Sequence, residues 1–293
     1  MKKALKVISL MLVAVLMVMS FAACGSKDDT ATGSDTSKEA KTPAVKVIDV
    51  NLTDEEYAFG VDKNQPELLE KVNSFIAEIK ANGTFDAICN KYFAGGTPDV
   101  IKSAALDSTK DQLVVATNAA FEPFEYTNGD GYSGIDMEIA KALADYLGKE
   151  LVIQNMDFDS VGQHKCDIAM AGLTVKAERE EYVTFSTPYY KASQRLVVKG
   201  SDTKFDGCTD VASVEAILNT LDSSVKIGVQ NGTTGQLYCE GDAEMEFPGL
   251  KAVCVGYKSG SLAVQDMING NINYVIIDAA PAACIAQSIN EVN

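Results

Sequence analysis

The sequence predicts an α/β protein with two doubly wound lobes and mostly parallel sheets. Two observations lead to this fold class. From residue 113 onward, short apolar runs typical of strands alternate with segments whose apolar residues recur at helical spacing. In addition, about 250 residues follow the first 44, which is enough for two lobes of ordinary size.

Residues 1–23 are typical of an export signal peptide. Three lysines lie within the first six residues, and residues 7–23 are almost wholly apolar. The segment ends in Phe21–Cys24 (FAAC), which resembles the signal of bacterial lipoproteins and implies cleavage before Cys24 and lipidation of its thiol. The alternative is an uncleaved membrane anchor, although the apolar run is near the lower length limit for a spanning helix. Both interpretations place the body outside the cytoplasm, held at the membrane.

The segments before residue 113 predict a tether, two helices and a linker. Residues 24–44 are rich in Ser, Thr, Asp and Lys without apolar periodicity, which predicts a flexible tether. A helix is expected from Pro66, with one apolar face and an end at Asn82-Gly83. A shorter helix follows over 85–93, and turn residues then indicate a linker up to residue 112.

The later elements follow one another at short intervals. Leu113–Thr117 is an apolar run typical of a buried strand. The next segment has Ile and Leu at helical spacing over 135–147, and Gly148 ends it. The remaining expected elements are strands at 150–154, 167–170, 226–229 and 274–278, and a helix at 262–269 closed by Gly270.

Composition excludes several classes of partner. The formal net charge of −16 argues against nucleic acid and anionic membrane surfaces. The six cysteines after Cys24 form no CxxC pair, so no metal site and no cofactor are expected. Their disulfide pairing stays open, although Cys166 and Cys254 lie in apolar runs typical of packed thiols. His164 has no His or Cys partner at metal-binding spacing and is expected on the surface.

Several motifs follow one another after residue 115: Ala116–Phe124 (ATNAAFEPF), Gly134–Glu138 (GIDME), Asp167–Thr174 (DIAMAGLT) with Arg179, Phe185–Tyr190 (FSTPYY), Gly228–Thr234 (GVQNGTT) and Asp278. Together they resemble the amino-acid-binding family of extracytoplasmic solute receptors that serve ABC importers. The resemblance covers about 180 residues. It implies a periplasmic binding protein-like fold of type II, in which two α/β lobes are joined by a hinge.

One block of the family pattern is out of place. Residues 55–93 begin with Glu55–Lys63 (EEYAFGVDK) and resemble the family's C-terminal segment, yet they precede the segment that normally begins the mature protein. We therefore expect a circular permutation, which exposed termini and a surface linker permit. Lobe 1 would comprise 53–193, built from the permuted segment 53–96, a linker 97–112 and 113–193. Lobe 2 would comprise 194–293 with a returning strand near 45–52.

The candidate binding residues fall at the carboxyl ends of the expected strands, where α/β lobes bind ligands. Arg179 is one of only two arginines, the other being Arg195. A guanidinium grips a carboxylate bidentately, which lysine cannot do. The competing interpretations are a surface salt bridge for Arg179 and a turn cap for Asp278.

The resemblance implies a role for each candidate. Arg179 would hold the ligand α-carboxylate, helped by the Thr174 amide and by Thr234. Asp278 would hold the α-ammonium, together with the Thr174 hydroxyl and the Gly172 carbonyl. Two aromatic rings would sandwich the ligand side chain, and two further residues of the matching motifs complete the ligand-binding set; these four are Phe121, Phe158, Ala171 and Gln230.

Two departures from the family pattern affect specificity. Asn118 stands where receptors for basic amino acids often carry an acid, which favours a polar or neutral ligand. The stretch between Phe158 and Asp167 is shorter than the family's helix there, which puts the position of Phe158 in doubt.

The expected function is that of a lipid-anchored, monomeric receptor that delivers a free amino acid to an ABC permease and its ATPase, without catalysis. One alternative is an enzyme of the same fold, such as a cyclohexadienyl or arogenate dehydratase, which would need a general acid or base in the cleft. The other is a ligand sensor that acts through a separate signalling chain.

Overall fold

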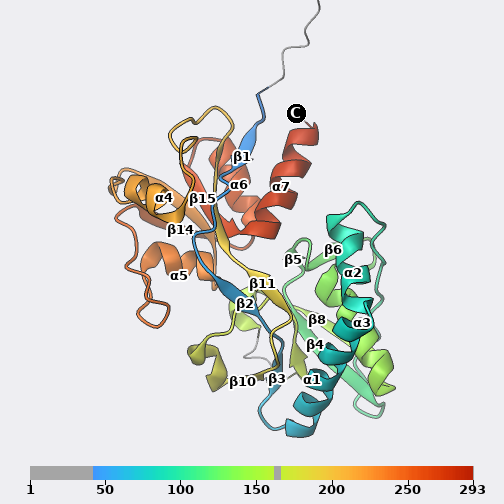
Figure 1. Cartoon of the computed structure of the whole chain (residues 1–293). Coiled ribbons are helices and arrows are strands. Elements are labelled where there is room, and N and C mark those ends of the chain that lie inside the picture. The colour runs from blue at the N-terminus through green and yellow to red at the C-terminus, as the bar shows by residue number, and fades with distance from the viewer. Residues whose placement is uncertain (1–41, 162–165, 293) are drawn as a thin grey trace, which may run out of the picture. The chain divides into compact units, whose positions relative to one another are not determined.

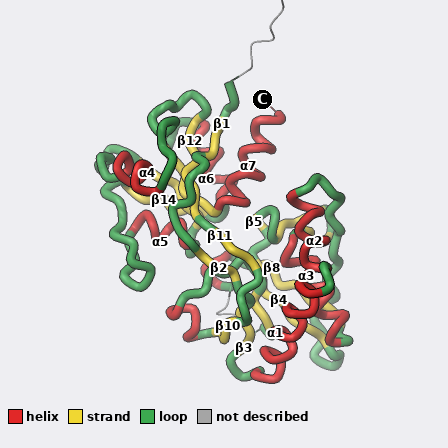
Figure 2. Tube along the Cα trace, viewed as in Figure 1, coloured by secondary structure: helices red, strands yellow, loops and turns green. Residues whose placement is uncertain are grey.

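The computed structural model describes residues 42–161 and 166–292, which belong to one compact unit. Two five-stranded sheets carry most of the secondary structure, and Figures 1 and 2 show them with helices packed on both. The leader, the tether up to residue 41, Cys24 and His164 lie outside the described residues. None of the helices within the described ranges is long and apolar enough to cross a membrane.

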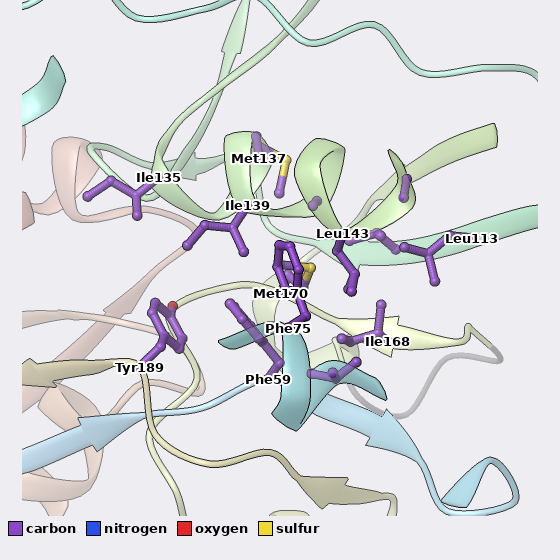
Figure 3. Packing of buried hydrophobic residues seen from close by; sticks show 14 of the residues in the cluster. Phe59, Phe75, Leu113, Ile135, Met137, Ile139, Leu143, Ile168, Met170 and Tyr189 are labelled. Atoms are coloured by element: carbon purple, nitrogen blue, oxygen red, sulfur yellow. The ribbon is translucent and has the colours of Figure 1, made fainter. Parts of the chain in front are cut away.

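The first sheet has the strand order β10-β3-β9-β4-β8. Its strands are β3 (Gly60–Asp62), β4 (Gln112–Thr117), β8 (Glu150–Asn155), β9 (Ile168–Ala169) and β10 (Val183–Phe185). Three helices cover one face: α1 (Pro66–Ala81), α2 (Thr84–Phe93) and α3 (Ile135–Leu147). Figure 3 shows their apolar side chains meeting those of the sheet, including Phe59, Phe75, Leu113 and Ile139. The small sheet of β5 (Ala120–Phe121), β6 (Glu125–Asn128) and β7 (Gly131–Ser133) adjoins α3.

The second sheet has the order β1-β12-β15-β13-β14 and helices on both faces. Its strands are β1 (Val45–Val47), β12 (Gln194–Lys199), β13 (Lys226–Gln230), β14 (Val253–Tyr257) and β15 (Tyr274–Asp278). One face packs against α4 (Val211–Leu218) and α5 (Thr234–Glu240), and the other against α6 (Gly260–Ile268) and α7 (Ala279–Val292). Burial of both faces defines a doubly wound lobe.

The expectation of mostly parallel sheets is wrong. In each sheet, two of the four strand pairs are parallel and two are antiparallel. The reason lies in the two crossings between the sheets. A chain that enters from the other lobe arrives at the carboxyl edge of the parallel strands, so β3 and β12 run away from that edge.

Two short strands form these crossings. Strand β2 (Glu55–Tyr57) leads into β3, and β11 (Tyr190–Ala192) leads into β12. They pair antiparallel, with Tyr57 opposite Tyr190, and Figure 1 shows them running between the two sheets. We call this pair the hinge strands.

The expected helices are observed within one or two residues, and Gly148 ends α3 with a left-handed φ of 70°. Several elements were not expected: the β5–β6–β7 sheet, the strands on either side of the hinge, and helices α4, α5 and α7. Helix α4 does carry a start signal in the sequence, because Asp210 and Ser213 form a reciprocal capping pair.

Candidate functional site

The carboxyl ends of the parallel strands of both sheets point toward the hinge strands. Asp278 is the last residue of β15 and lies opposite Gln194 at the start of β12. Asn118 follows β4, Thr174 follows β9, and Thr234 opens α5 after β13. Thr174 also forms a bridge with Tyr57 of the hinge. The fold thus gathers polar residues of both lobes around one short segment.

Arg179 connects the two lobes directly. Its Nη1 donates to the Thr174 carbonyl oxygen at 2.7 Å, and its Nη2 donates to the Gly232 carbonyl oxygen at 3.0 Å. The guanidinium also lies over the Phe158 ring, 5.5 Å from its centroid, in cation–π geometry. Burial lowers the pKa of Arg179, while the acidic side chains of Glu55 and Asp278 oppose that shift. A planar cation therefore lies at the junction, with two carboxyl groups near it.

Asp278 is one of these carboxyl groups. Its side chain is buried, and its Oδ1 accepts a hydrogen bond from the hydroxyl of Tyr57. Burial, reinforced by the neighbouring Glu55, raises the pKa of Asp278 from 3.8 to about 7. The group can therefore hold or release a proton near neutral pH, and a nearby cation would favour the charged form.

Glu55 is the other carboxyl group, and sequence reasoning missed it. It is 3% exposed, and its Oε2 accepts from the Thr174 hydroxyl at 2.8 Å. Its Oε1 accepts from Thr53 at 2.5 Å and from the Gln194 amide at 3.1 Å. Along β2, Glu55 and Tyr57 are buried and Glu56 is exposed, but the sequence Glu-Glu-Tyr does not indicate which glutamate points inward.

The predicted threonines and amides also meet across the junction. The Thr234 hydroxyl donates to the Thr174 hydroxyl at 3.1 Å. Asn118 Oδ1 accepts from the Gln230 amide at 3.1 Å, and its own amide donates to the Met156 carbonyl at 2.6 Å. The first two contacts link lobe 1 residues to the first residue of α5 and to the last residue of β13.

Phe121, Ala171 and Gly172 line the lobe 1 side of this arrangement. Phe121 is 4% exposed and stacks against Phe124 at 6.0 Å between ring centroids. Gly172 has φ +54°, and its amide donates to Asp136 at 3.0 Å. A Cβ on Gly172 would lie 2.9 Å from the Phe121 ring, so glycine is required by both its backbone and its contacts.

The two predicted aromatic walls line different cavities. Phe158 borders a cavity of about 230 Å³ that also contacts Leu173, Arg179 and Leu237. Phe121 borders a separate groove of about 440 Å³, formed between the β5–β6 segment and helices α6 and α7. Phe158 therefore contacts the guanidinium of Arg179, while Phe121 packs against the hinge side.

A buried ion pair also joins the lobes, and it was not predicted. The Lys176 side chain is 5% exposed, and its Nζ lies 2.8 Å from Asp242 Oδ2 and 2.6 Å from Glu178 Oε2. Nearby, Glu244 accepts a hydrogen bond from the Ala177 amide at 2.5 Å. The loop after α5 is thereby attached to the segment that carries Arg179.

Comparison with known proteins identifies the family. The sequence pattern of the bacterial extracellular solute-binding proteins, family 3, matches residues 9–95 and 113–276. The chain belongs to this family. Membership, with the observed sheets, establishes the two-lobed α/β fold of type II periplasmic amino-acid-binding proteins and an extracytoplasmic location.

Individual relatives match parts of the chain. It is 40% identical to the arginine-binding extracellular protein ArtP of Bacillus subtilis over 97 residues, which is 32% of this chain and 38% of that protein. It is 30% identical to the ABC transporter arginine-binding protein 1 of Escherichia coli, over 59% of this chain and 65% of that one. The matches thus span less than two thirds of these relatives.

Solved structures of amino-acid-binding proteins also match part of the chain. An ancestral amino-acid-binding protein, described as a precursor of cyclohexadienyl dehydratase, is 31% identical with a TM-score of 0.50. The match covers 61% of this chain and 74% of that structure. An ancestral arginine-binding protein bound to arginine is 29% identical, also with a TM-score of 0.50, over 61% and 75% of the two chains.

Proposed function

We propose that this protein is a lipid-anchored receptor that binds one free amino acid between its lobes and delivers it to an ABC permease and its ATPase. The observation that carries the proposal is the placement of Arg179 and Asp278, a cation and an acid on opposite lobes, beside the same hinge segment. A free amino acid carries one carboxylate and one ammonium a few ångströms apart. Only a closed cleft lets one ligand contact both residues.

In this proposal, the ligand replaces contacts that the side chains now make with one another. The α-carboxylate binds Arg179, the Thr174 amide and Thr234, in place of the two carbonyl oxygens that the guanidinium now contacts. The α-ammonium binds Asp278, the Thr174 hydroxyl and the Gly172 carbonyl, and competes with the Tyr57 hydroxyl for Asp278. The ligand thus exchanges internal hydrogen bonds for charged ones of greater strength.

The ligand side chain would meet Asn118, Gln230 and Phe121. The amides of Asn118 and Gln230 and the Phe121 ring favour a polar or neutral side chain. An acidic residue at position 118 would instead favour a basic one. Arginine is the second candidate ligand, because two relatives are named for it and because Glu55 adds a buried carboxyl group beside Asp278.

We also propose that the chain is a circular permutant of its family. The Asn290 side chain near the end of α7 accepts from the Ala44 amide at 2.8 Å and donates to the Val45 carbonyl at 2.9 Å. Residues 96–112, which contain the proposed linker, are also the internal segment that the family pattern skips. These observations support an ancestral connection from α7 into β1.

The most direct test of the receptor is a thermal-shift screen of the twenty amino acids, since a ligand that binds only the folded state raises its melting temperature. We expect one amino acid or a small related set to raise it in a concentration-dependent way. Absence of a shift with all twenty would contradict the proposal. Within the same screen, the shifts with glutamine and with arginine show whether the site prefers a polar, neutral side chain or a basic one.

An enzyme of the same fold is the second candidate function. The observation that favours it is the buried Asp278, whose pKa of about 7 suits a general acid. Incubation with arogenate and with prephenate, followed by assay for the aromatic product, separates the two functions. Turnover that disappears in Asp278→Asn would replace the receptor proposal.

A further inference from the structure

Two cysteines of lobe 2 meet on the face of the sheet that α4 and α5 cover. Cys239 lies one residue before the end of α5 and is 1% exposed, while Cys254 lies in β14 and is half-buried. Their thiols are hydrogen-bonded to each other. Both belong to the same apolar cluster, so neither thiol lies in bulk water.

The backbone around both residues is held in place. The Cys239 carbonyl accepts from the Leu250 amide at 2.8 Å, which folds the intervening loop back onto the end of α5. In the sheet, Cys254 lies opposite Ile227 of β13, and the preceding Val253 amide donates to Val225 at 2.8 Å. These hydrogen bonds hold the backbone of α5 and of β14 beside the two thiols, and a disulfide forms only between cysteines whose backbones are close and fixed.

The compartment permits the bond. The family is extracytoplasmic, and disulfides form and persist in oxidising environments outside the cytoplasm. We propose that Cys239 and Cys254 are joined by a disulfide in the exported protein and that this bond fixes α5 to β14. This inference does not depend on the ligand or on the transport function.

The reaction is an exchange with an oxidised dithiol, such as a disulfide oxidoreductase or a small-molecule disulfide. One of the two cysteines, as its thiolate, attacks a sulfur of the partner disulfide and expels one partner thiolate. The other cysteine then loses its proton and attacks the mixed disulfide, which expels the second thiolate. The two cysteines lose two electrons and two protons, and the partner becomes a dithiol.

The bond would brace one wall of the candidate site. Helix α5 begins at Thr234, whose hydroxyl contacts Thr174, and Gly232 just before it accepts from Arg179. Anchoring the far end of this short helix to β14 limits how far its first turn can move. Because Cys239 is buried, we expect exchange to occur before α5 packs onto the sheet.

Peptide mapping of the full chain tests the proposal. The protein is secreted or refolded with oxidised glutathione, denatured without reductant, alkylated and cut with trypsin. Cleavage after Lys226, Lys251 and Lys258 places the two cysteines on separate peptides, 227–251 and 252–258. We expect these peptides as one cross-linked species that reductant separates into two, and a melting temperature that falls when the protein is reduced.

Controls keep the result unambiguous. In Cys254→Ser, we expect Cys239 to become fully alkylated and the effect of reductant on the melting temperature to disappear. Cys208→Ser removes a half-buried thiol that packs against the same cluster and should retain both the cross-link and the effect. Recovery of both peptides alkylated from the oxidised wild type, or of either joined to another cysteine, would overturn the proposal.

Discussion

At the scale of single residues, the site depends on a small number of charges held away from water. Arg179 contacts carbonyl oxygens of both lobes, and Asp278 accepts a hydrogen bond from Tyr57 beside the buried Glu55. Burial of an acid disfavours its charged form, so Asp278 is held near its titration point until a cation pairs with it.

This arrangement predicts that ligand binding depends on pH. The ammonium of an amino acid pairs with the carboxylate form of Asp278. Because the pKa of Asp278 is about 7, the side chain is protonated below that pH and must release its proton when the ligand binds. We expect the affinity to fall by about tenfold for each pH unit below 7. Calorimetry in two buffers of different ionisation enthalpy measures the released proton.

Asp278→Asn should weaken binding and abolish this pH dependence, whereas Asp130→Asn, at an exposed position, should leave both unchanged. The same pH slope in Asp278→Asn would assign the pH dependence of binding to another group.

The folding stability of the ligand-free protein depends on pH in the opposite sense. The folded pKa is raised above the ordinary 3.8, so the stability that Asp278 contributes is present below that value and is lost as pH rises through 7.

Sequence reasoning expected Arg179, Asp278, Thr174 and Thr234 around one point. Thr174 and Asp278 lie at the ends of expected strands, whereas Arg179 and Thr234 came from the family resemblance. It missed Glu55 and Lys176, which belong to segments distant in sequence from their partners. Glu55 gains its role from Gln194 across the hinge, and Lys176 from Asp242 on the other lobe. Such pairings depend on how the lobes meet, which the local pattern does not contain.

At the scale of elements, periodicity predicted α1 and α3 well but missed α7, which is as long as α3. Helices α1 and α3 bury one apolar face each. Pro66 begins α1, and Gly148 ends α3. The three-residue strands β2, β3, β10 and β11 are too short to show alternation, and their direction is set by the crossing between lobes. The sheets were therefore predicted as more parallel than they are.

Two glycine substitutions should lower the free energy of unfolding by different amounts, one in the loop after β9 and one before α2. Gly172→Ala and Gly83→Ala both place a Cβ on a left-handed backbone. Only at Gly172 would the new atom collide, at 2.9 Å from Phe121 and 3.2 Å from Tyr57, whereas nothing lies within 4 Å at Gly83. We expect Gly172→Ala to cost about 1–3 kcal/mol more, as overpacked sites do. Urea unfolding measures both variants, and equal losses would contradict the close packing.

At the scale of the whole molecule, the proposed circular permutation concerns how the two ends of the chain and the segment before β4 are placed. The end of α7 lies beside β1, as Figure 1 shows, and Asn290 bonds to the backbone of residues 44 and 45. The segment from Gly95 to Asp111 runs along lobe 1, where Ile101 bonds to Tyr132 and Ala104 to Leu151.

We predict that the chain can be returned to the family order without loss of fold. A variant that begins at residue 113, joins residue 292 to residue 44 through a short flexible peptide and ends at residue 96 should unfold cooperatively and keep its ligand. As a control, opening the chain between Val115 and Ala116, inside the buried strand β4, should prevent folding. Failure of the first variant alongside intact secretion of the parent would contradict the permutation.

The central claim is that Arg179 holds the carboxylate of a free amino acid. Isothermal calorimetry with the amino acid found by the thermal-shift screen tests it on the wild type, on Arg179→Lys and on Arg195→Lys. Because Lys keeps the charge but loses the bidentate fork, we predict that Arg179→Lys binds about 10- to 150-fold more weakly, the equivalent of one charged hydrogen bond. Arg195→Lys should bind as the wild type does, because the Arg195 side chain pairs with Asp49 and Asn51 and contacts none of the proposed ligand-binding residues. The wild type should also reject the corresponding amino-acid amide, and unchanged affinity in a folded Arg179→Lys would contradict the account.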